Sequence, residues 1–208
     1  HDLVLFNTPF HVAFNSGYSY FSEAADILID EVQKRIAKGE GPLPKNSPRL
    51  ACQFIPFCVP WINKAFVDNG VNLGINTFFA EPSTQKKYFN PSKIYRSLAQ
   101  QWFCNPSAVS MQNEADIICD IITKYPLDGV LYGFFTFDRW IGALNKTLVR
   151  IVEERTKIPH YYLEGDFWSD EKYTLEDKID QIKGIAYSVK INHLVSGLNN
   201  AEKKDTKQ

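Results

Sequence analysis

The sequence predicts an α/β fold, with a four-stranded parallel sheet flanked by helices in three layers. Short apolar segments alternate along the chain with longer segments whose apolar residues recur every three or four positions. These are the patterns of buried strands and of amphipathic helices. Strands separated by helices are joined by right-handed crossovers, which make the strands parallel and cover both faces of the sheet. Flavodoxin-like and Rossmann-like folds have this architecture.

A first strand-helix-strand unit is expected within residues 48–79. Residues 48–54 (PRLACQF) follow a segment rich in Gly, Pro and Asn, and they are apolar enough for a buried strand. Helical periodicity covers residues 61–69 and ends at Gly70, a residue suited to a helix C-cap. Residues 71–79 alternate in polarity and predict the second strand.

The same two patterns predict the remaining elements. Helices are expected over residues 21–38, 92–103, 111–124, 141–152 and 174–190, the last with Thr174 as N-cap. Strands are expected over residues 130–134 and 160–163. The early helix carries an inner apolar stripe of Ala25, Leu28, Val32 and Ile36. These elements form one α/β domain, residues 48–195, between a helical segment, residues 1–47, and a charged flexible tail, residues 196–208.

The composition excludes several classes of protein. Lys and Arg number 23 against 24 Asp and Glu, so there is no basic field to attract nucleic acid. No apolar stretch approaches the roughly 20 residues that span a bilayer, and the N-terminus lacks the order of a signal peptide. We therefore expect a cytoplasmic protein without a membrane segment. The four cysteines are too scattered for a disulfide scaffold, in agreement with a reducing compartment.

The sequence also lacks the motifs of several common enzyme classes. It has no GxxxxGK, GxGxxG, HExxH or GxSxG pattern, which excludes the corresponding NTPases and hydrolases. The four histidines have no metal-ligand spacing, and His160 is expected to be a packed or surface residue.

Candidate site residues follow the predicted strands, because ligands of open α/β sheets bind beyond the carboxyl ends of the strands. Glu164 and Asp166 flank a glycine after the fourth strand and could orient a substrate or a partner group. The chemistry alone favours the alternative that Asp166 or Asp170 caps a following turn or helix. Asp138 and Arg139 are an anion or carbonyl site or, as we favour, a surface ion pair.

The cysteines divide into two kinds. Cys52 lies in a predicted strand and Cys119 in an apolar helical run, so both are expected to pack in the core. Cys58 and Cys104 fall in expected loops, where their thiolates could contact an iron-sulfur cluster or another subunit. Two cysteines do not complete a four-thiolate site, which favours free thiols.

Five motifs follow one another in the order PRLACQF, DNGVNLGINTFFAEP, QWFCNPSA, LDGVLYGFFTFDRW and KIPHYYLEGDFWSDEKY. In this order they resemble the C-terminal half of the activator-dependent 2-hydroxyacyl-CoA dehydratase (D-component) and benzoyl-CoA reductase subunits, most specifically over residues 128–173. Family subunits are much longer, and their N-terminal α/β half supplies two cysteines that ligate a cluster. The resemblance, together with the start at His1 without Met, implies that the chain is a fragment of a longer two-domain subunit.

The resemblance implies one-electron chemistry on a CoA thioester by a lyase or reductase of anaerobic metabolism. An ATP-dependent activator supplies a low-potential electron through a [4Fe-4S] cluster to make a ketyl radical, and homologous subunits pair. The residues that match family motifs or adjoin them, and so could bind substrate, are Asp138, Arg139, Trp140, Glu164 and Asp166. None is assigned a catalytic role.

One position departs from the family pattern. The family's third cysteine ligand lies in the loop after the Asp-Gly-Val strand, and Phe137 stands at that place here. Phenylalanine cannot ligate iron, and the neighbouring Thr136 is a poor substitute for a soft thiolate. Three hypotheses follow: a catalytic component whose clusters come from other sequence or a partner, a non-catalytic paralogue or scaffold that pairs with an active subunit, or a flavodoxin-like binding domain.

Overall fold

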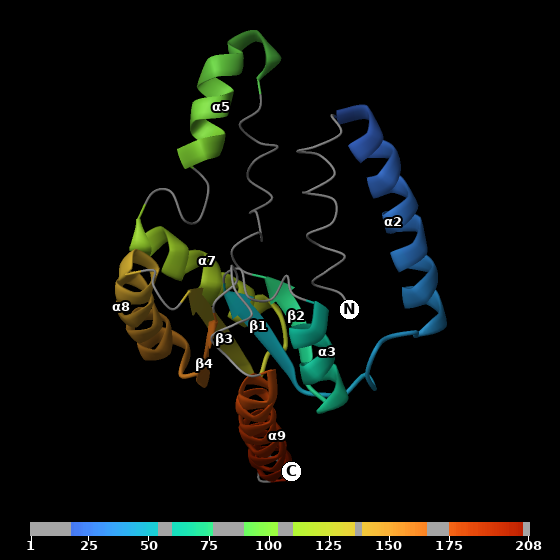
Figure 1. The fold of residues 1–208 in the computed structure, drawn as a ribbon, viewed down its shortest axis with the longest axis vertical. Helices are drawn as coiled ribbons and strands as arrows, with labels where there is room; N and C mark the ends of the chain where they lie inside the picture. Colours follow the sequence, from blue (N-terminus) through green and yellow to red (C-terminus); the bar gives the residue numbers. More distant parts are fainter. Residues whose placement is uncertain are drawn as a thin grey trace. The chain divides into compact units, whose positions relative to one another are not determined.

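The computed structural model describes residues 18–53, 60–76, 90–103, 110–135, 139–165 and 175–205 (Figure 1). The helices are α2 (Tyr18–Lys38), α3 (Pro60–Asp68), the short 3-10 helix η2 (Pro91–Lys93), α5 (Ile94–Phe103), α7 (Met111–Lys124), α8 (Arg139–Thr156) and α9 (Leu175–Asp205). The strands are β1 (Arg49–Gln53), β2 (Asn72–Asn76), β3 (Gly129–Phe135) and β4 (His160–Gly165). None of the described helices is long and apolar enough to cross a membrane.

The four strands form one parallel sheet in the order β2-β1-β3-β4. Strands β1 and β3 pair with Ala51 opposite Val130, and β3 and β4 pair with Leu131 opposite Tyr161. This order is the one found in flavodoxin-like folds, so the predicted fold class is confirmed.

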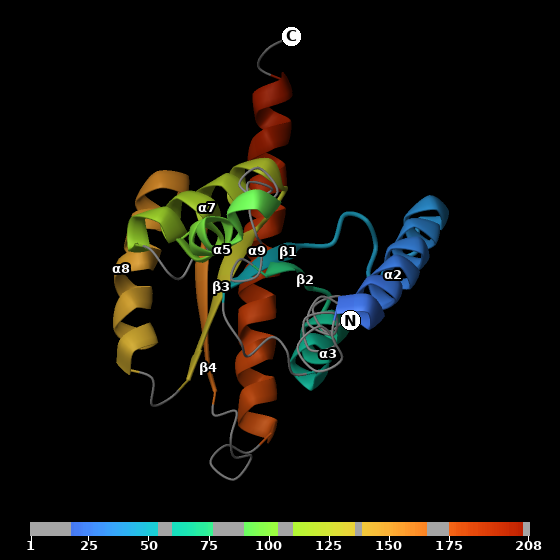
Figure 2. The same cartoon turned by 90° about the horizontal axis from the view of Figure 1, so that it is seen from above.

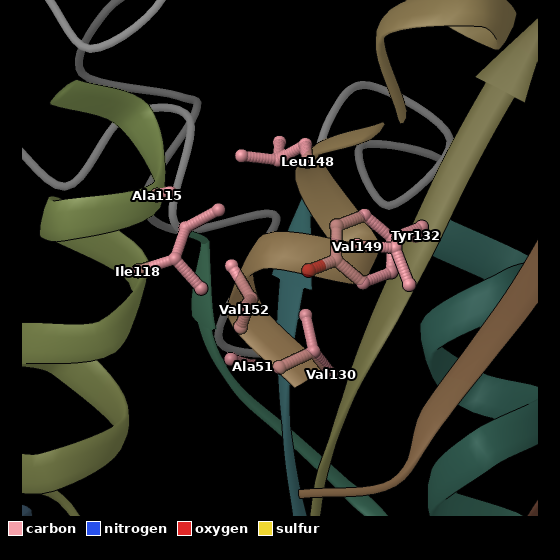
Figure 3. Close-up of a cluster of buried hydrophobic side chains, with 8 residues drawn as sticks. All are labelled: Ala51, Ala115, Ile118, Val130, Tyr132, Leu148, Val149 and Val152. Atoms are coloured by element: carbon pink, nitrogen blue, oxygen red, sulfur yellow. The ribbon is translucent and has the colours of Figure 1, made fainter. Parts of the chain in front are cut away.

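An apolar cluster forms where α7 and α8 pack on the strands (Figures 2 and 3). Its buried members are Ala51 from β1, Val130 and Tyr132 from β3, Ala115 and Ile118 from α7, and Leu148, Val149 and Val152 from α8. The helical members recur at three- and four-residue steps, and the strand members at every second residue, so each element buries one face here.

The opposite face of the sheet is covered as well. Leu50 and Cys52 of β1 and Leu131 of β3 alternate with the cluster residues, and each has no exposed surface. Leu163 of β4 is 2% exposed. Burial on both faces is the expected property of a parallel sheet between two helical layers.

Helices α3 and α9 pack on each other within a compact unit of the chain, distinct from the unit that contains α7 and α8. The fully or nearly fully buried residues of these two helices are Ile62 and Phe66 on α3, and Ile182, Ala186 and Val189 on α9. The three α9 residues are spaced by four and three positions and form one stripe.

At two positions, the backbone geometry explains why the residue is glycine. Gly70 follows α3 with a φ of 78°, so its expected role at the helix end is confirmed. A Cβ atom at Gly129 would lie 2.7 Å from the Tyr161 ring and 3.0 Å from the carbonyl oxygen of Pro159. The Asp-Gly-Val motif therefore needs its glycine because a neighbouring segment approaches the backbone closely.

Over the residues that the structure describes, the predicted helices and strands agree with it apart from two features, whereas Phe54, residues 77–79 and the predicted N-cap Thr174 lie outside the described residues. Helix α9 continues to Asp205, so the expected end near residue 190 is wrong, and the first ten residues of the predicted tail are helical. Ile191, Leu194 and Val195 extend the apolar helical pattern beyond that point. The predicted inner stripe of α2 is also not buried, since Val32 is 40% and Ile36 72% exposed.

Candidate functional site

The order of the sheet identifies where a ligand is expected to bind. Strand β1 lies between β2 and β3, and the chain order reverses between β1 and β3. In doubly wound folds, ligands bind at the carboxyl ends of the two strands that flank this reversal. Gln53 is the last residue of β1 and lies at that edge.

Gln53 and Glu114 form a partly buried polar pair at this edge. The Gln53 side chain is 3% exposed, and its Nε2 donates a hydrogen bond to Oε1 of Glu114 in the first turn of α7. The start of α7 is fixed by Ser110, whose hydroxyl accepts from the backbone N–H of Asn113 at 3.1 Å. The helix cap therefore holds the Glu114 carboxyl against the end of β1.

The environment of Glu114 favours a neutral carboxyl. Burial raises the pKa of Glu114 above its usual value, and the hydrogen bond from Gln53 opposes that shift in part. A carboxyl with a raised pKa can hold and release a proton nearer to neutral pH than an exposed one.

A row of ring side chains continues across the same face of the sheet. Gln53 pairs in register with Tyr132 of β3, and Tyr132 pairs with Tyr162 of β4. The Tyr132 ring lies 6.0 Å from the Tyr162 ring and 5.5 Å from the His160 ring, measured between centroids. Polar atoms thus extend from β1 to β4 beneath α7 and α8.

Two members of this row carry buried polar atoms without a hydrogen-bond partner in the described part of the chain. These are the Tyr132 hydroxyl and both ring nitrogens of His160. Burial raises the pKa of Tyr132 and lowers the pKa of His160, so both side chains are held neutral. His160 was expected to be a packed or a surface residue, and the burial of both ring nitrogens agrees with the first alternative.

The site residues predicted from sequence are placed only in part. Glu164 is half-buried on β4, opposite Phe134 of β3, and by strand alternation it shares the face of Tyr162. Arg139 and Trp140 begin α8, and three residues, 136–138, separate this helix from the end of β3. The other predicted positions, Cys58, Cys104, Phe137, Asp138 and Asp166, lie outside the described residues.

The cysteines that the structure describes do not fit an iron-sulfur cluster. Cys52 is completely buried, and burial raises its thiol pKa well above the usual range. Cys119 is half-buried beside the apolar cluster, and burial also raises its pKa. Both thiols are therefore poor sources of thiolate, as expected for packing residues. Within the described ranges, no three His, Cys, Asp or Glu side chains gather as metal ligands.

Sequence reasoning did not select Gln53 or Glu114. Their signal was present but weak: Gln53 is an amide in an otherwise apolar strand, and Glu114 lies next to the inward-facing Ala115. A polar residue at a buried position needs a partner, which links the two once the strand and helix are known to pack together.

Comparison with protein-family models identifies a family for this chain. A family model described as 2-hydroxyglutaryl-CoA dehydratase, D-component, matches residues 4–183 of the 208-residue chain. The match includes β1 to β4, α7, α8 and the Gln53–Glu114 pair. No individual curated protein matches the chain.

Proposed function

Because the chain belongs to the 2-hydroxyglutaryl-CoA dehydratase D-component family, we propose that it is a component of an iron-sulfur-dependent, activator-coupled enzyme that acts on a CoA thioester. The reaction is the dehydration of a 2-hydroxyacyl-CoA or a related reduction of the benzoyl-CoA type, carried out in the cytoplasm by one-electron chemistry. The family match over residues 4–183 is the observation that carries this proposal.

The cysteines of this chain set a limit on how a cluster is held. Of the four cysteines, Cys52 and Cys119 pack in or beside the core. Cys58 and Cys104 are then the only thiols of this sequence left for a cluster, and a four-thiolate site needs more. We therefore assign the remaining ligands to sequence outside this chain or to a homologous partner subunit. When bound, a [4Fe-4S] cluster supplies a low-potential electron.

The roles proposed for this chain concern the substrate pocket. Glu164 lies at the carboxyl edge of the sheet, where the acyl group of a ligand is expected. Asp138, Arg139, Trp140 and Asp166 remain proposed contacts of the thioester, by their place in the motifs that follow β3 and β4. The Gln53–Glu114 pair adds a carboxyl that can carry a proton at this edge.

Anaerobic purification tests the cluster part of the proposal. We expect iron and acid-labile sulfide when the chain is prepared with its homologous subunit, and dehydration of a 2-hydroxyacyl-CoA when ATP and the activator are added. Replacing both Cys58 and Cys104 by Ser is expected to lower the iron content, whereas Cys119→Ser is the matched control and should leave it unchanged. Iron-free protein that stays inactive with activator and partner would refute an electron-transferring role.

A specific residue favours the second candidate function, a non-catalytic scaffold subunit. Phe137 stands where the family has a ligating cysteine. If that position faces a cluster in this protein's assembly, Phe137→Cys should add iron to the preparation. If the chain is a scaffold, the wild type should form a stable iron-free complex with its partner, and Phe137→Cys should not restore dehydration.

A further inference from the structure

Glu114 lies at the carboxyl edge of the sheet, although it belongs to a helix. Helix α7 ends at Lys124, and residues 125–128 connect it to the start of β3 at Gly129. The inner side of α7 packs on β1 and β3 (Figure 3). The helix therefore runs back along the strands, and its first turn, which contains Glu114, lies toward their carboxyl ends. The hydrogen bond between Glu114 and Gln53, the last residue of β1, agrees with this position.

The Glu114 carboxyl is oriented by a neutral amide rather than by a cation. Nε2 of Gln53 donates to Oε1 of Glu114, and the Gln53 side chain is only 3% exposed. Burial therefore fixes the amide, and the amide fixes the carboxyl. No ion pair involves Glu114 in the part of the chain that the structure describes. Buried carboxylates are commonly paired with a cation, whereas a neutral partner leaves the carboxyl able to hold a proton.

The surroundings of Glu114 favour the protonated form of its carboxyl. Burial raises its pKa, and the hydrogen bond from Gln53 opposes this shift only in part. Tyr132 pairs in register with Gln53 on the neighbouring strand. Burial, with smaller contributions from neighbouring groups that include Glu114, raises the pKa of Tyr132, so this hydroxyl is neutral as well. Glu114 itself is only half-buried, so a proton on its carboxyl can reach a ligand or solvent.

We propose that Glu114 is the acid that gives a proton to the hydroxyl group leaving carbon 2 of a 2-hydroxyacyl-CoA, and that Gln53 is its positioning residue. This role rests on the proposed function, because it serves the dehydration of that substrate. Open α/β sheets bind ligands beyond the carboxyl ends of their strands, and this pair lies at that edge. A general acid works best when its pKa is closer to neutral pH than that of an exposed carboxyl.

Atoms and charge balance in the proposed step. The thioester has first taken up one electron from the activator system of the proposed function, and it carries one negative charge. Hydroxide is a poor leaving group, so the bond between carbon 2 and the oxygen breaks as that oxygen accepts the proton of Glu114. The oxygen keeps both electrons of the bond and leaves as water, and the negative charge passes to the Glu114 carboxylate. The carboxylate then regains a proton from solvent, which its partial exposure permits.

Kinetics of the enzyme prepared without oxygen, with its homologous subunit and activator, test the role of Glu114. The substrate is whichever of 2-hydroxybutyryl-CoA and 2-hydroxyglutaryl-CoA the wild type dehydrates faster. Glu114→Gln should lower kcat by about 100-fold or more. Its KM should change little, because the amide can still donate a hydrogen bond to the hydroxyl group. Wild-type kcat should fall as the pH rises through the raised pKa of Glu114, and Glu114→Gln should lack this fall.

Gln53→Leu tests the positioning role with a side chain of similar size. The hydrogen bond from Gln53 lowers the pKa of Glu114, so its loss should raise that pKa and move the fall in kcat to higher pH. A residue with only a structural role would lower the melting temperature and leave the position of this fall unchanged. Circular dichroism and iron content should match the wild type in both variants, which separates a loss of kcat from a loss of fold.

Asp116 provides the matched control, two residues further along α7. It is exposed, and its carboxylate accepts a hydrogen bond from Arg155 at 2.5 Å, which keeps its pKa below the usual value. Asp116→Asn should therefore leave kcat and its pH dependence unchanged. A wild-type kcat in Glu114→Gln, or an equal loss in Asp116→Asn, would overturn the role of Glu114 while the proposed function stands. A wild type that dehydrates neither substrate would count against the proposed dehydration and the role of Glu114 together.

Discussion

Replacing Tyr132 by phenylalanine should stabilise the protein. Tyr132 has no exposed surface, and its hydroxyl has no hydrogen-bond partner in the described part of the chain. Figure 3 shows the hydroxyl directed into the apolar cluster. An unsatisfied buried polar group of this kind destabilises the folded state by about 1 to 3 kcal/mol. Phenylalanine keeps the ring and its contacts with His160 and Tyr162.

The expected gain is therefore about 1 to 3 kcal/mol in the free energy of unfolding, or a Tm increase of roughly 2 to 12 °C for a chain of this size. Urea unfolding monitored by circular dichroism measures it, with an unchanged m-value as evidence that the two states are the same. Tyr95→Phe is the control, because that residue is 86% exposed. Its effect should stay within about 0.5 kcal/mol.

A loss of stability in Tyr132→Phe would refute this reasoning. It would mean that the hydroxyl is satisfied in solution by a buried water or another group, and that the space between α7, α8 and the sheet is not dry. An equal gain in Tyr95→Phe would also contradict the argument, because the effect would then not depend on burial.

Four further substitutions test other parts of the fold. Burial raises the pKa of Glu114 above its usual 4.5. The free energy of unfolding should therefore fall as the pH rises from that value through the raised pKa. Glu114→Gln should remove this pH dependence, as measured by urea unfolding at several pH values. Burial lowers the pKa of His160 below its usual 6.5. The protein should therefore lose stability as the pH falls from that value through the lowered pKa. His160→Gln should make the Tm depend less on pH in this range. Gly129→Ala would place a Cβ 3.0 Å from the Pro159 oxygen and should cost about 1 to 3 kcal/mol in chemical denaturation. Gly142→Ala in α8 meets open space and should instead gain about 0.5 to 1 kcal/mol; similar effects at both glycines would refute the steric argument.

The fold could be predicted because its elements have strong local patterns. The 111–124 helix has a serine cap and an inner stripe, and its bounds are those predicted. Strand β1 is recognisable as a short apolar run. The prediction that the apolar stripe of α2 is buried was wrong, because periodicity shows that a helix has an apolar side but not what covers that side. The helical part of the tail was missed because its mixed charges and its lack of large apolar residues were interpreted as a flexible end.

The site was predicted less well than the fold. Glu164 was selected because it follows the predicted strand 160–163, and the structure includes it in the last residues of β4. Gln53 and Glu114 are 61 positions apart, and only the packing of α7 on β1 brings them together. The unpaired atoms of Tyr132 and His160 could not be found from sequence either, since the sequence does not show which polar atoms of the described residues are buried without partners.

The order of the strands has a consequence for how the protein forms during synthesis. Strand β1 lies inside the sheet, yet Ala51 pairs with Val130, which is translated 79 residues later. At a translation rate of roughly 5 to 20 residues per second, about 4 to 16 s pass between the synthesis of Ala51 and that of its partner. During this time, its backbone edge toward β3 and its apolar side chains are open to unwanted pairing. We expect the nascent chain to need protection from aggregation until β3 has left the ribosome.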